Sequence, residues 1–220
     1  MGSPEQLIFF FSYLLRGVLT TFSISVLAFL LGTVIGIPLM LLRAFGGRSG
    51  EVVVEGYEKL LRGVPIIIIM LLFYFGIGVR IPLLRDPFVS ATLALGMRSG
   101  AYQSQIFRGA KRGVGEDQMM AARSLGMSEL RAFRHVVLPQ MFIIASAGLG
   151  SEYALIVKDS AYAFVLGLPG DIMMRARTLR AAFLTNLPYI PAALLYIALT
   201  FPIATYLDRW GTRKKKELGI

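Results

Sequence analysis

The sequence predicts an all-α protein, an integral membrane helical bundle with about five transmembrane helices. Of its 220 residues, 55% are hydrophobic and the mean hydropathy is +0.66, whereas soluble domains are about 45–50% apolar. The excess lies in long runs without charged residues, and about 20 such residues cross a bilayer as a helix. Lys and Arg gather between these runs, as they do in the loops of membrane proteins.

The first and last of these runs contain no charged side chain, and the third and fourth contain one each. Two glycine pairs, Gly32-x-x-x-Gly36 and Gly96-x-x-x-Gly100, place small residues on one helix face, which allows another helix to approach closely. A short apolar segment, 7–15, is expected to lie at the membrane interface or to pack on the bundle. The expected spans are 18–42, 64–79, 87–107, 136–157 and a stretch within 181–207.

An odd number of spans places the two termini on opposite sides of the membrane. With these spans, 15 of the Lys and Arg residues fall on one side and 7 on the other. The basic side is normally cytoplasmic, so the N-terminus is expected outside and the C-terminus in the cytoplasm. The basic tail Arg213 to Lys216 is expected to anchor this topology on an anionic leaflet, with specific lipid binding as the alternative. No internal repeat divides the chain, and residues 1–220 are expected to form a single transmembrane domain.

Several kinds of site are excluded by residue types that the chain lacks. It has no Cys and a single His, His135, which leaves no thiolate or imidazole cluster for a metal. It has no G-x-x-x-x-G-K-[ST] phosphate loop, so it does not hold ATP in the usual way. The net charge of +10 flanks apolar spans and does not form the basic face of a nucleic-acid-binding protein. An enzyme is therefore not expected, nor is a cofactor in this chain.

The predicted cytoplasmic loop at 109–135 contains signals for two short helices. Glu116 and Asp117 suit the positive end of a helix, and Gly126 can end that helix in the left-handed conformation. Ser128 can cap a second helix that begins at Glu129. Such a two-helix elbow at the membrane surface has a shape suited to docking a partner. A solvated loop held by lipid charge is the alternative.

The same loop carries a recognisable family pattern. Met120-Ala121-Ala122, three residues, Gly126, nine residues and Val136-Val137-Leu138-Pro139 resemble the EAA loop of ABC importer permeases, with Met120 in place of the leading Glu. Further stretches resemble the polar amino acid branch of these permeases, although Gln105 again replaces a Glu of the pattern. They are Arg62-Gly63-Val64-Pro65, Ala101-Tyr102 with Gln105-Ile106-Phe107-Arg108-Gly109, Leu138-Pro139-Gln140 and Lys158-Asp159-Ser160-Ala161.

The resemblance covers about residues 15–210 and implies a type I ABC importer permease in a prokaryotic inner membrane, which forms the pathway for a polar amino acid. It implies a second permease subunit, identical or not, an extracytoplasmic solute-binding protein, and ATP-binding-cassette ATPase subunits that hold ATP and magnesium. The elbow is then expected to sit in a cleft of the ATPase and to couple ATP hydrolysis to transport. The coupling residues would be Glu116, Asp117, Gln118, Ala121, Ala122, Gly126, Met127 and Ser128.

Arg98 and Glu152 are the charged residues inside the predicted spans. A charge near the bilayer centre costs at least about 2.5–3.5 kcal/mol, so such residues pair or line a cavity. Counted from the outer ends, Arg98 lies roughly 16 Å deep and Glu152 roughly 9 Å deep. One hypothesis is that Arg98 holds the carboxylate of an amino acid substrate and Glu152 holds its ammonium or a basic side chain. A structural Arg98–Glu152 pair, or unrelated roles with separate snorkelling, are the alternatives.

Two other classes of function are open from the sequence. One is a passive channel or a secondary transporter, and the other is a non-transport membrane scaffold. Secondary transporters commonly show internal repeats, which this sequence does not, and a channel does not need a docking elbow. Basic, amide and acidic amino acids are all candidate substrates.

Overall fold

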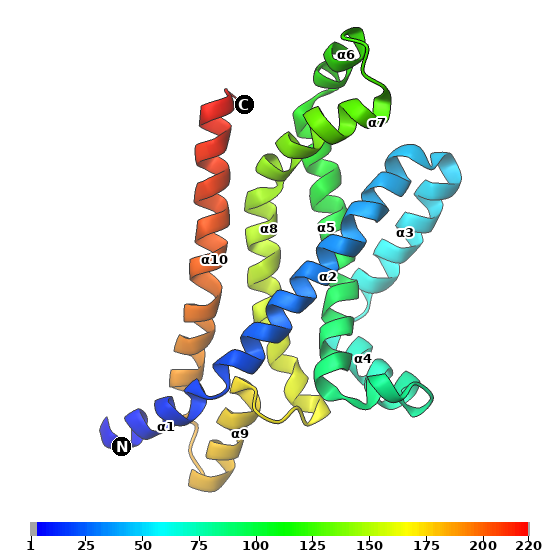
Figure 1. Cartoon of the computed structure of the whole chain (residues 1–220). Coiled ribbons are helices and arrows are strands. Elements are labelled where there is room, and N and C mark those ends of the chain that lie inside the picture. Colours follow the sequence, from blue (N-terminus) through cyan, green and yellow to red (C-terminus); the bar gives the residue numbers. More distant parts are fainter. Residues whose placement is uncertain (1–3, 220) are drawn as a thin grey trace.

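The computed structural model describes residues 4–219, and over that range the chain folds into helices without a β-strand. Helices α5 (Pro87–Val114), α8 (Leu138–Ser160) and α10 (Tyr189–Leu218) run alongside one another, while α2 (Val18–Phe45) crosses them obliquely (Figure 1). The N-terminus and the C-terminus lie at opposite ends of the bundle. The all-α membrane bundle predicted from the sequence is confirmed.

Close contact between α2 and α5 forms the centre of the bundle. A Cβ atom at Gly32 would lie 2.5 Å from the Ser99 hydroxyl oxygen, and one at Gly96 would lie 2.5 Å from a methyl carbon of Leu31. Neither distance leaves room for a side chain. The two glycine pairs therefore bring the helices together, as predicted.

The described residues contain three helices that are long and apolar enough to cross a membrane, or up to four if a bent pair forms one span. The three are Val18–Phe45, Glu129–Leu166 and Tyr189–Leu218. Helix α5 is long enough, with 28 residues, but it carries buried polar side chains. These polar side chains face other helices rather than lipid, so α5 is less apolar than an ordinary membrane span. With α5 and the bent pair included, the fold has the five predicted segments. The polar residues in question are Ser90, Ser99, Gln103 and Ser104.

The second predicted span, 64–79, is not a straight helix. The chain reverses after α2 into α3 (Gly47–Gly63), then bends by 98° into α4 (Ile66–Leu71). The bend lies at Pro65, because the residue before a proline is disfavoured in the helical region, and Val64 is extended (φ −97°, ψ 131°). The segment continues as a π-helical turn, η1 (Leu72–Gly76), and 3-10 turns η2 (Ile77–Val79) and η3 (Pro82–Arg85).

Two further helices cover the end of the bundle at which the N-terminus lies (Figure 1). Helix α1 (Pro4–Leu15) packs on α9 (Ile172–Phe183) and α10, with Phe10 and Leu14 fully buried. The alternative that this apolar segment packs on the bundle is thus confirmed. Helix α10 begins at Tyr189, inside the predicted stretch 181–207, and the end of α9 occupies the start of that stretch. The 3-10 turn η5 (Ala161–Leu166) leads from α8 towards α9.

Candidate functional site

Two short helices form an elbow beyond the end of α5, at the same end of the bundle as the C-terminus (Figure 1). Helices α6 (Glu116–Ser124) and α7 (Glu129–Ala132) begin where the sequence predicted. Gly126 between them has φ +83°, and the N–H of Met127 donates to the carbonyl of Ala122 at 3.2 Å. This is a left-handed C-cap, which a residue with a Cβ adopts only with strain.

Ser128 precedes α7 with the extended backbone of an N-cap (φ −64°, ψ 156°), but its hydroxyl makes no capping hydrogen bond. The first turn of α7 is closed by the backbone instead, where the N–H of Ala132 donates to the carbonyl of Ser128 at 2.8 Å. The predicted side-chain cap is therefore wrong, although the helix begins at the predicted residue.

The elbow exposes large apolar side chains. Leu125 is 83% exposed, Leu130 76% and Met120 57%. A hollow of ≈ 440 Å³ lies between the end of α5 and the two short helices, and Met120 is one of the residues that line it. Apolar groups exposed together suit contact with another protein. Of the predicted coupling residues, Ala122 is buried and Met127 half-buried, while those exposed are Glu116, Asp117, Gln118, Ala121, Gly126 and Ser128.

Charged side chains meet inside the bundle, between α5 and α8. Arg98 of α5 forms an ion pair with Asp159 of α8, and their side chains are only 16% and 14% exposed. Glu152, also on α8, is buried beside Ser99, within electrostatic reach of both Arg98 and Asp159. It forms no ion pair with any residue of the described part of the chain. The structure thus brings Arg98 and Glu152 together but gives the direct pairing to Asp159.

The alternative of a direct Arg98–Glu152 structural pair is not what forms, and the physical reason is the length of the fourth span. The helix does not end near residue 157 but continues through α8 and η5 to Leu166. Asp159 consequently lies inside the bundle at the level of Arg98, rather than at the outer membrane surface.

Arg62 joins this cluster from α3. The guanidinium carbons of Arg62 and Arg98 lie 4.9 Å and 5.3 Å from the ring centre of Tyr102, close enough for cation–π attraction. The sequence placed Arg62 in a cytoplasmic loop, whereas the fold-back of α3 brings it to the middle of α5. We call Arg62, Arg98, Glu152 and Asp159 the charged centre; it holds two cations and two carboxyl groups.

A second polar cluster, missed from the sequence, surrounds Glu58 of α3. Its carboxylate is buried and accepts hydrogen bonds from Arg43 at 3.2 Å, Ser104 at 2.7 Å and Gln105 at 3.0 Å. Arg43 also pairs with Glu51 at 3.2 Å. The spacing in the sequence could have indicated that Glu58 is buried, because Glu58 lies one helical turn after Val54 and therefore on the same buried face of α3. Glutamine suits position 105 because its amide donates to Glu58, whereas the carboxylate of a glutamate there would lie beside the carboxylate of Glu58.

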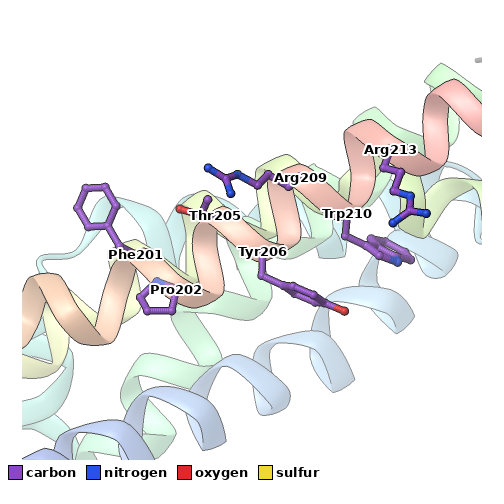
Figure 2. Close-up of a pocket in the computed structure, with 7 residues that line it drawn as sticks. All are labelled: Phe201, Pro202, Thr205, Tyr206, Arg209, Trp210 and Arg213. Carbon is purple, nitrogen blue, oxygen red and sulfur yellow. The ribbon is translucent and has the colours of Figure 1, made fainter.

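An open groove of ≈ 670 Å³ lies on the outward side of α10, away from both clusters. Figure 2 shows its lining side chains projecting from one long stretch of that helix. The groove contains none of the predicted site residues. It is lined by Phe201, Pro202, Thr205, Tyr206, Arg209, Trp210 and Arg213.

Comparison with known proteins identifies the fold and the family. Residues 28–215 match the model of the binding-protein-dependent transport system inner membrane component. The chain belongs to this family. Its members are membrane permease subunits, not enzymes, and the ATPase of such a system is a separate subunit.

The chain is similar along most of its length to curated permeases. It is 32% identical to the arginine transport permease ArtQ of Bacillus subtilis, over 93% of each chain. It is 32% identical to the octopine permease OccQ of Rhizobium radiobacter, over 93% of this chain and 91% of that one. It is 30% identical to the histidine/lysine/arginine/ornithine permease HisQ of Escherichia coli, over 72% and 74%.

Solved structures agree with this relationship. The crystal structure of an amino acid ABC transporter with histidines matches with a TM-score of 0.84 at 26% identity, covering 97% of this chain and 99% of that one. The inward-facing MetNI methionine ABC transporter matches with a TM-score of 0.75 at 19% identity, over the same shares, which supports the fold alone. The importer permease fold predicted from the sequence is confirmed.

Proposed function

We propose that this permease carries a polar amino acid and that Arg98 and Glu152 contact the substrate. The observation that carries the proposal is Glu152, a buried carboxyl group beside the Arg98–Asp159 pair that forms no ion pair within residues 4–219. A buried carboxylate needs a cation or hydrogen-bond donors, and an amino acid brings an ammonium group. Several relatives are named for arginine, octopine or histidine/lysine/arginine/ornithine, so cationic amino acids are the first candidates.

Arg98 supplies the complementary charge. Its guanidinium presents a planar fork that can hold a carboxylate through two hydrogen bonds. Its Nε atom is buried without a hydrogen-bond partner, so the fork has unused donor capacity next to Asp159. A zwitterion placed between Arg98 and Glu152 would meet a cation at one end and an anion at the other.

The elbow is proposed to couple the pathway to an ATPase partner, which holds ATP and magnesium. The exposed Met120, Leu125 and Leu130 would enter an apolar cleft of that subunit, with Glu116 and Asp117 at the rim. Because α6 follows α5 after a single residue, Gly115, movement of the elbow would be passed to the helix that carries Arg98.

We infer an outside N-terminus and a cytoplasmic C-terminus in a prokaryotic inner membrane. Support comes from the excess of Lys and Arg on the side of the elbow and the C-terminus, and from the termini at opposite ends in Figure 1. The further partners are a second permease subunit, an extracytoplasmic solute-binding protein and membrane lipid. Since the chain has no Cys, a single Cys placed in the 213–216 tail should react with an impermeant maleimide only after the cells are opened.

The substrate proposal is tested by uptake into proteoliposomes that contain the permease, a candidate ATPase subunit and a candidate solute-binding protein. Labelled arginine, histidine, glutamine and aspartate are compared. Glu152→Gln keeps the shape of the side chain but loses its charge, and we expect uptake of a cationic substrate to fall about tenfold or more, as for a lost charged hydrogen bond. Glu217→Gln, in the exposed tail, is the matched control. Unchanged uptake, or flux without ATP, would contradict the proposal.

The coupling proposal needs a separate measurement. Gly126→Asp should leave the permease folded but reduce its association with the ATPase, measured by co-purification and by ATP turnover. An intact complex with normal turnover and normal uptake would show that the elbow is not the coupling surface.

A further inference from the structure

We infer that the outward groove of α10 binds an anionic phospholipid, with the acyl chain along Phe201 and Pro202 and the phosphate on Arg209 and Arg213. The inference does not depend on the proposed substrate or on the proposed orientation. It concerns a surface that lies apart from the charged centre and the elbow.

The groove is exposed and built from one helix. Phe201 is 63% exposed and Tyr206 67%, and the side chain of Arg213 is 83% exposed. Figure 2 shows the lining side chains leaving the helix on two sides, with Phe201, Thr205 and Arg209 on one side and Pro202, Tyr206 and Trp210 on the other. The opposite side of α10 is the one that packs, because Gly211 lies against Ser146 of α8. The groove therefore faces either lipid or a protein partner.

The order of side chains along the groove matches the order of groups in a phospholipid leaflet. Phe201 and Pro202 are apolar, Tyr206 and Trp210 are amphipathic aromatics, and Arg209 and Arg213 are cations. Aromatic residues of this kind prefer the membrane interface. The helix rises by roughly 18 Å from Phe201 to Arg213, comparable to half of the ~30 Å hydrocarbon core. One lipid can thus contact the whole groove.

The cations are available to a phosphate. Arg209 and Arg213 lie one helical turn apart on the same face. Arg209 makes no ion pair in the described part of the chain, and Arg213 uses Nε for Glu217 at 3.1 Å. Guanidinium forks suit phosphate oxygens, and the indole N–H of Trp210 is a further donor. An anionic lipid is favoured over a zwitterionic one because no positive headgroup then opposes the arginines.

A second copy of the chain is a poorer occupant. A two-fold contact through this face sets the same patch against itself, so Arg209 and Arg213 would meet their own copies. The neighbouring hollow between α8 and α10 shares Phe201 and Thr205 with the groove, but it suits close helix approach better, because most of its other lining residues are small. These include Ala147, Ser151, Ala154 and Ala204.

The test is lipid binding to the purified full-length chain, measured by native mass spectrometry while phosphatidylglycerol or phosphatidylcholine with identical acyl chains is titrated. We expect preference for phosphatidylglycerol. Each cation near a membrane surface is worth about fivefold, so Arg209→Gln with Arg213→Gln should weaken phosphatidylglycerol binding by roughly 25-fold. Arg177→Gln with Arg180→Gln removes the same charge from exposed residues of α9 and should change little.

The contrary outcomes are distinct. Equal binding of the two lipids, unchanged binding by the α10 double variant, or equal loss in the α9 control would each overturn the inference. So would loss of the permease dimer in the α10 variant, because the groove would then be a subunit contact. Circular dichroism is used to check that both variants fold. The assay uses neither ATP nor amino acid, so its failure is independent of a failure of the proposed transport function.

Discussion

Removal of Arg98 is expected to destabilise the protein more than removal of its partner Asp159. Both side chains are largely buried, with 16% and 14% exposed, and loss of one partner of a buried pair costs about 3–5 kcal/mol because the other charge is left uncompensated. Without Asp159, Arg98 still faces Glu152. Without Arg98, Asp159 and Glu152 are two neighbouring acids with only Arg62 nearby.

The magnitudes follow from this asymmetry. Arg98→Met should lower the free energy of unfolding by about 4 kcal/mol, and Asp159→Asn, partly compensated by Glu152, by about 2 kcal/mol. The double variant should lose about 1.5 kcal/mol less than the sum, because the interaction is counted in both single variants.

Unfolding is followed by circular dichroism while sodium dodecyl sulfate is titrated into detergent micelles. The exposed Glu55–Lys59 pair provides the control, since Glu55→Gln and Lys59→Gln should show no measurable coupling. Additive losses at Arg98 and Asp159, or a larger loss for Asp159→Asn than for Arg98→Met, would refute the reasoning.

Three further predictions concern other parts of the chain. Gly126→Ala should cost about 1–2 kcal/mol of local stability because of its left-handed backbone, and should lower transport per ATP hydrolysed, whereas helical Gly109→Ala with open space around it should not. Gln105→Glu sets an acid against buried Glu58 and removes the hydrogen bond that the amide donates to it, so the thermal unfolding midpoint should fall; an unchanged midpoint would contradict this. Burial raises the pKa of Asp171 to about 6, from 3.8 for the free side chain. The folded state therefore holds the proton more tightly, and stability should rise as the pH falls from about 7 to 4. Detergent unfolding at several pH values should show this slope, and Asp171→Asn should remove it.

The sequence alone was sufficient for the features that depend on neighbouring residues. Long apolar runs with few or no charges predict α2, α8 and α10 because a helix of apolar residues is what a bilayer accepts. The elbow was predicted from Gly126 and the acids at its start, since a helix end is set by the conformations open to a few residues. The family pattern in the same loop named the class of protein.

The sequence also misjudged features that local rules do not govern. Val64-Pro65 was placed inside a straight span, although the restriction before proline favours the bend that forms there. The end of the fourth span was set by a fall in hydropathy, whereas packing against α5 and η5 keeps Lys158 and Asp159 helical.

Only the tertiary structure decided which charges meet. Arg98 and Asp159 are separated by 61 positions in the chain, and Glu58 and Ser104 by 46. Arg62 reaches Tyr102 because α3 folds back beside α2 and α5. The sequence determined that charges inside the bundle need partners, because a charge in a medium of low dielectric constant is costly. It did not determine the partners, since each pairing depends on the axial register of two helices, and that register is set by packing along their whole contact.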